Sequence, residues 1–259
     1  MINTIRSDFY RLVRSIGMYV TLAFLIAVGV AQVAPKQPGT IGVNMGDMTT
    51  QQSLTGPDTL RFLLSTDNNL VFFVIPVFVV VAGGIFSSGT VKNTLATGLS
   101  RTRLYLAKWL LASAIALVFV VVYLGSGLLA TTIARGAGVW TAADVSGLTR
   151  GALAVVVILL AFTSVGIALT FWLRNGAAAW VYLGFAVIPI IAAIALSETI
   201  SPEKFAATIP YNMVISMTTF AVWGDLTRPF ILTALGVALA WIVVSVVGGI
   251  AAFSRAEIK

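Results

Sequence analysis

The chain has 259 residues, of which 59% are hydrophobic and only 10% charged, and its mean hydropathy is +1.00. A soluble domain carries about 25% charged residues, so this composition excludes a soluble globular protein and indicates an integral membrane protein. Cysteine and histidine are both absent, which excludes disulfides, thiolate or imidazole metal sites and a histidine general base. We therefore predict no catalytic residues and no metal site.

The first segment, 1–14, predicts an amphipathic helix lying in the cytoplasmic membrane interface. Its apolar side chains recur at helical spacing, and its basic side chains lie mostly on the other flank. The alternative is a basic topogenic tail without defined structure. The segment is too long for the basic region of a cleaved signal, so we expect the first span to be retained. The residues concerned are Ile5, Phe9, Leu12, Arg11 and Arg14.

Six windows without Asp, Glu, Lys or Arg are each long enough to cross a bilayer, which requires about 20 apolar residues. They predict an all-α polytopic membrane protein with six transmembrane helices in one domain, 1–259. The predicted spans are about 15–35, 68–91, 109–134, 151–173, 175–197 and 229–254.

Two long polar segments between the spans are predicted as outer loops. The first, 36–67, is rich in Gly, Thr and Gln and is typical of an exposed loop; the alternative is a small folded cap. The second, 198–228, is partly apolar and contains Pro202, Pro210 and Gly224 as breaks. It is compatible with a short re-entrant or interfacial helical hairpin before the last span.

The distribution of Lys and Arg predicts that both termini are cytoplasmic. With the N-terminus inside, ten of these residues lie in inner segments and six in outer segments, as the positive-inside rule requires. The net charge of +7 then belongs to a membrane face in contact with anionic lipid, so no nucleic acid is expected as a partner.

Irregular residues inside the spans have two interpretations each. Pro76 and Pro189 interrupt the second and fifth spans; they predict hinges, or are tolerated as proline often is in membrane helices. Small residues predict close helix packing. The small residues are Gly125, Ser126, Gly127, Gly166, Gly248 and Gly249.

Missing motifs exclude several classes of function. No GxxxxGK[ST] motif occurs, so the chain does not bind ATP by that route. No acidic or basic residue lies deep in any of the six windows, which argues against an ion-coupled carrier. The sequence Gly125-Ser126-Gly127 has no histidine to activate its serine, so a serine protease is not expected.

The segment between the second and third spans, 87–108, predicts two helices joined by a turn. A short helix from about Thr90 to Thr97 should stop at Gly98. Ser100 can then cap the helix that leads into the third span. From the residues alone, this segment is either a rigid docking surface or a basic loop that only determines topology.

The same segment resembles the signature of ABC-2 type permeases. These are the membrane subunits of bacterial ABC exporters, including the lantibiotic-immunity, bacitracin-resistance and sodium-export-like branches. Many relatives carry an acidic residue where this chain has Ser87 and Ser88. The matching residues are Phe86, Gly89, Thr90, Val91, Lys92, Asn93, Leu95, Gly98, Ser100, Arg101, Tyr105, Ala107 and Lys108.

The resemblance implies a type V exporter-like fold in a bacterial plasma membrane and a role in antibiotic resistance or immunity. A cytosolic ABC ATPase dimer, carrying ATP and Mg, would grip the segment as a coupling helix, and this chain would hold no cofactor. A second permease subunit, identical or different, would complete a path for an amphiphilic cargo such as a peptide or drug. The implied ATPase-coupling residues are Gly89, Thr90, Lys92, Asn93, Leu95, Gly98, Ser100, Arg101 and Tyr105.

Two other functions stay open at this point. The chain is also compatible with a peptide-sensing or immunity subunit that binds at its outer loops and transports nothing. An ion-coupled carrier is the third function, with sodium sites built from carbonyls and hydroxyls.

Overall fold

The computed structural model describes residues 2–33, 56–65, 69–87, 89–221 and 226–255, and every regular element in them is helical. The prediction of an all-α, multi-pass membrane protein is thus confirmed. Five of the described helices are long and apolar enough to cross a membrane. They are α2 (Ile16–Val33), α7 (Arg101–Arg135), α8 (Ala142–Leu173), α9 (Ala177–Thr199) and α12 (Arg228–Arg255).

A sixth apolar segment is helical but irregular. It consists of α4 (Asn69–Phe78), the π-helical turn η1 (Val79–Gly83) and α5 (Gly84–Ser87). The axis then turns by 70° into α6 (Thr90–Ala96), so this bent pair counts as one further candidate span. The last two residues of the predicted window 68–91, Thr90 and Val91, belong to α6, and the window stays a prediction as a sixth span.

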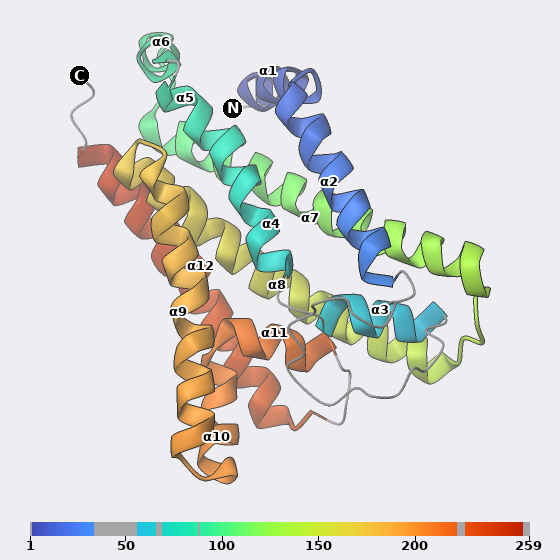
Figure 1. Ribbon diagram of the computed structural model, residues 1–259. Coiled ribbons are helices and arrows are strands. Elements are labelled where there is room, and N and C mark those ends of the chain that lie inside the picture. Colours follow the sequence, from blue (N-terminus) through green and yellow to red (C-terminus); the bar gives the residue numbers. More distant parts are fainter. Residues whose placement is uncertain (1, 34–55, 66–68, 88, 222–225, 256–259) are drawn as a thin grey trace.

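Helix α8 forms the centre of the bundle (Figure 1). Within its most apolar stretch 61% of the residues are buried, compared with 17% for α2, α9 and α12, so these three helices lie at the periphery. Helices α4, α7, α9, α11 and α12 all pack on α8. Small residues allow this close approach: Gly166 of α8 faces the ring of Phe78 in α4 with no room for a side chain.

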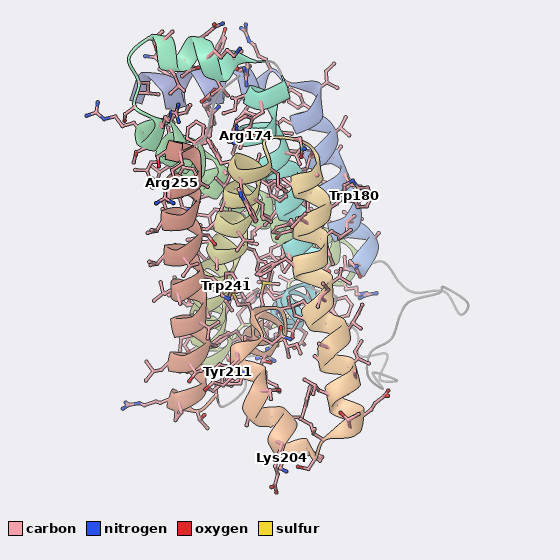
Figure 2. The ribbon with its side chains drawn as sticks, turned by 90° about the vertical axis from the view of Figure 1, so that its left-hand side faces the viewer. Arg174, Trp180, Lys204, Tyr211, Trp241 and Arg255 are labelled. Carbon is pink, nitrogen blue, oxygen red and sulfur yellow. The ribbon has the colours of Figure 1, made fainter. Side chains whose placement is uncertain are left out.

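The bundle has two distinct ends (Figure 1). Helix α1 (Ile2–Val13) and α6 lie across one end, which we call the α6 end. The turn at Arg174 and the last residue of α12, Arg255, lie at the same end (Figure 2). The opposite end carries α10 (Pro202–Thr208) with Lys204, and we call it the α10 end. Helix α1 and the C-terminal end of α12 thus lie at the same end of the bundle.

The described part of the first predicted outer loop is not an exposed loop. Residues Gly56–Ser65 form helix α3, whose Leu60, Leu63 and Leu64 are buried against the bundle. Their spacing of three and four residues places them on one helical face. The exposed-loop prediction is therefore wrong for α3, while residues 36–55 and 66–67 lie outside the described part.

The described residues of the second predicted outer loop form two short helices, and a re-entrant or interfacial hairpin stays a prediction. Helix α10 is followed by a 3₁₀ turn, η2 (Ile209–Tyr211), and by α11 (Met213–Ala221), which packs on α8 and α3. Asn212 holds α11 in place: its side-chain amide donates to the carbonyl of Pro189 in α9 at 3.0 Å, and its oxygen accepts the N–H of Val214 at 3.1 Å.

Candidate functional site

The α6 end carries the segment that the sequence singles out. Helix α6 begins after Gly89, whose φ of 65° is in the left-handed region that glycine favours. It stops at Thr97, and Gly98 follows with a φ of 86°. The predicted helix stop at Gly98 is therefore confirmed.

The predicted cap of the next helix is also present. The hydroxyl oxygen of Ser100 accepts the backbone N–H of Arg103 at 3.3 Å, and α7 begins at Arg101. A serine in this position satisfies a donor that the first helical turn leaves open. The turn between α6 and α7 is therefore short and held at both sides.

Helix α6 has an inner and an outer face. Val91 is only 4% exposed, and Leu95 packs against the same core. Lys92, Asn93 and Ala96 are exposed; we call these three residues the α6 surface. Helix α6 is therefore packed against the bundle on one face and exposed on the other.

Of the nine predicted coupling residues, only Lys92 and Asn93 belong to the α6 surface, and Arg101 and Tyr105 lie in α7. Arg101 donates through its Nη1 to the carbonyls of Phe253 at 3.2 Å and Ser254 at 2.8 Å. Tyr105 is fully buried, and its hydroxyl donates to the carbonyl of Ser245 at 3.2 Å. Both side chains therefore tie the start of α7 to α12, and Arg101 also compensates carbonyls at the end of α12.

An aromatic cluster supports this connection. The ring of Phe171 in α8 lies 4.9 Å from Tyr105 and 4.8 Å from Phe253, centroid to centroid, in edge-to-face geometry. Phe86 in α5 lies 5.3 Å from Phe171 in the same geometry. Such arrangements are favourable for aromatic pairs. The cluster joins α5, α7, α8 and α12, and α6 packs on α5.

A buried ion pair joins α1 to the same region. The Lys108 Nζ lies 2.8 Å from Oδ2 of Asp8, with Lys108 only 2% exposed and Asp8 16% exposed. Lys108 belongs to the sequence pattern, but Asp8 does not. The sequence offers no signal for this pair, because its members are a hundred positions apart and only the packing of α1 on α7 brings them together.

The interfacial-helix residues separate into two groups. Leu12 is buried, and Ile5 packs against the core, whereas Phe9, Arg11 and Arg14 are exposed. The predicted helix over 1–14 is present as α1, Ile2–Val13, while its position in the membrane interface stays a prediction. Its apolar residues face two different surroundings, the protein core and the outside of the bundle.

The two predicted hinges lie in different contexts. Pro76 lies inside α4, three residues before the π-helical turn η1 begins at Val79; a proline removes one backbone donor from a helix. Pro189 lies inside α9 and is held by Asn212. Whether either proline acts as a hinge stays a prediction.

The cavity beside Pro76 is too small for an organic molecule. Its volume is about 10 Å³, and every lining residue except Thr21 is apolar. That volume has room for one water at most. In the described residues, no group of three or more carboxylate, histidine or cysteine side chains could hold a metal ion.

No model of a protein family matches the chain, and no curated protein matches it.

Proposed function

We propose that this chain is the membrane subunit of an ATP-driven exporter, and that an ATPase on the cytoplasmic side docks on the α6 surface. The observation that carries the proposal is helix α6. It lies across the end of the bundle at 70° to the segment before it, with an anchored inner face and an exposed outer face.

Charge and aromatic residues support the proposed orientation in the membrane. The α6 end is the end that the positive-inside rule assigns to the cytoplasm. Exposed Trp180 lies toward this end and exposed Trp172 comes two residues before the turn at Arg174, whereas exposed Tyr211 lies toward the other end. Aromatic side chains are enriched at the two interfaces of a bilayer, so this distribution supports a bundle that crosses the membrane between them.

The candidate coupling residues would have two roles, contact with the ATPase and transmission of its movement. Lys92 and Asn93 would contact the ATPase. Arg101 and Tyr105, which bind the backbone of α12, would transmit the movement into the bundle. The aromatic cluster behind them makes the start of α7 and the end of α12 a single packed unit, as a lever requires.

Because the helices of this subunit are closely packed, we place the path for the cargo between two subunits and not within one. Helices α2, α7, α9 and α12 all expose large apolar side chains, among them Phe24, Val121, Ile188 and Val244. A second permease subunit, of the same or a different chain, would then cover one of these faces. An amphiphilic cargo suits a path without charged side chains.

The proposal is tested by charge reversal on the α6 surface. The full-length chain is purified from its native membrane, and co-purification of an ATPase with a Walker motif is measured together with its ATP hydrolysis. Lys92→Glu should reduce the association at least about tenfold, because like charges across an interface are costly.

The matched control is Lys204→Glu at the α10 end, where the exposed lysine is on the opposite side. This variant should leave association and hydrolysis unchanged. If no ATPase accompanies the wild-type chain, or if both variants behave alike, the proposed docking on α6 is wrong. Arg101→Glu is a poorer probe, because it also breaks the contact with α12.

A further inference from the structure

The π-helical turn η1 contains one residue more than an α-helical turn. The backbone N–H of Gly84 donates to the carbonyl of Val79, five residues earlier, whereas in an α-helix the partner is four residues earlier. Single π-helical turns inside α-helices are frequent at functional sites. Pro76, three residues before η1, removes a further backbone donor from the same stretch.

The helix before η1 is fixed to the bundle. Tyr182 in α9 donates through its hydroxyl to the carbonyl of Val71 at 2.8 Å, and its ring lies 5.0 Å from the ring of Phe78, centroid to centroid. Phe78 also fills the space in front of Gly166 in α8. These contacts hold α4 in place on two neighbouring helices.

The segment after η1 is short and has a glycine joint at each end. Helix α5 has four residues and lies between α4 and α6 (Figure 1). A side chain at Gly83 or Gly84 would meet no other side chain closer than 3.8 Å. Gly89, after α5, has a φ of 65° and open space around it, so the backbone can change direction there without a clash.

The cavity of about 10 Å³ beside η1 provides space for a change of register. Val80 and Val81 line it from η1, and Met18 of α2 and Ile115 of α7 line it from the neighbouring helices. A space of this size accepts one water-sized group, such as a methyl group of valine. The cavity thus lies against the side chains that a change of register would turn.

We propose that η1 is a two-state joint between α4 and α6. In the second state η1 is an α-helical turn, and its extra residue has moved towards Gly89. Each residue of an α-helix turns the chain by about 100° and advances it by about 1.5 Å, so α5 rotates and shifts by these amounts while α4 stays in place. Phe86 then leaves Phe171, and the start of α6 is displaced. The joint requires no ATPase and does not depend on the proposed function.

The test uses fluorine NMR of the full-length protein in lipid nanodiscs, with 4-fluorophenylalanine in place of Phe86 alone. The wild-type turn should give two resonances, one from the ring packed on Phe171 and one from the displaced ring, because nearby aromatic rings shift a fluorine signal. The same label in place of Phe24, which is exposed on α2, should give one resonance.

Deletion of Val79 should lock the joint. It removes the extra residue, so that η1 becomes an α-helical turn with α5 in its present position, and only the resonance of the packed ring should remain. A single resonance at position 86 in the wild type, or two resonances after the deletion, would overturn the proposal.

Deletion of Val121 is the matched control for stability. Both valines are exposed, but Val121 lies in the regular helix α7, where loss of one residue rotates all following residues, such as buried Tyr123, by about 100°. This deletion should lower the midpoint of thermal unfolding far more than deletion of Val79. An equal loss of stability in the two variants would show that η1 holds no extra residue, and the proposal would be wrong.

Discussion

Lys108 is the residue whose environment departs most from what its type prefers. An ammonium group that is 2% exposed is stable only with a counterion, because desolvation of an unpaired charge costs several kcal/mol. Asp8 provides that counterion from a helix whose axis lies across the end of the bundle. Lys108, which the sequence alone presents as one of the basic residues that determine topology, therefore forms a structural contact in the fold.

We expect the two members of this pair to respond differently to mutation. Asp8→Asn leaves the buried ammonium without a partner and should destabilise the protein by about 3 kcal/mol. Lys108→Met leaves a carboxylate that water still reaches, so its cost should be smaller. The double variant should be more stable than Asp8→Asn alone.

A double-mutant cycle of thermal unfolding in detergent measures this coupling. Arg103→Met, which removes an exposed positive charge one turn earlier, is the control and should change the midpoint little. Strictly additive effects of Asp8→Asn and Lys108→Met would show that the pair contributes nothing.

At the scale of the helices, the glycines separate into packed and open positions. Gly127, Gly166 and Gly249 each face atoms that a side chain would meet, whereas Gly125 and Gly248 face open space. The prediction that all of them serve close packing is therefore right for the first three and wrong for the other two. Only the orientation of each helix decides which member of a pair such as Gly248 and Gly249 faces inward.

Gly249→Ala should weaken the contact between α12 and α7. A methyl group at this position would overlap the ring of Tyr105, which is held by its hydrogen bond to Ser245. Overpacking of this kind costs about 1–3 kcal/mol, so the midpoint of thermal unfolding should fall by several degrees.

Gly248→Ala is the matched control in the same helix. It meets no atom and should leave the midpoint unchanged or raise it slightly, because alanine favours the helix. If Gly249→Ala is as harmless as its neighbour, α12 does not approach Tyr105 as closely as described.

At the scale of the whole molecule, the two ends of the bundle should face opposite sides of the membrane. The chain has no cysteine, so a single introduced cysteine reports its side without further changes. In right-side-out vesicles, a membrane-impermeant maleimide should label Ser201→Cys at the α10 end but not Thr97→Cys beside α6. Both positions are exposed.

Inverted vesicles should reverse this labelling, because the basic residues of the α6 end are retained in the cytoplasm. Ser254→Cys, at the end of α12, should behave like Thr97→Cys. Labelling of Thr97→Cys and Ser201→Cys from the same side would contradict both the topology and the docking of a cytoplasmic ATPase on α6.

The sequence alone determines the class of the protein and most of its local structure. Lipid cannot satisfy a polar backbone, so long uncharged windows become helices whatever their neighbours are. For the same reason of local chemistry, the helix stop at Gly98 and the cap at Ser100 could be predicted from a few adjacent residues.

Only the tertiary structure decides which residues meet. The roles of Arg101 and Tyr105 as partners of α12, the pairing of Asp8 with Lys108 and the burial of α3 all depend on helices distant in the chain. Apolar helices are alike in hydropathy on every side, so their pattern does not reveal which face meets protein and which meets lipid. The packing of the bundle determines which face of each helix is buried. It buries Val91 on the inner face of α6 and leaves Phe9 and Val13 of α1 exposed.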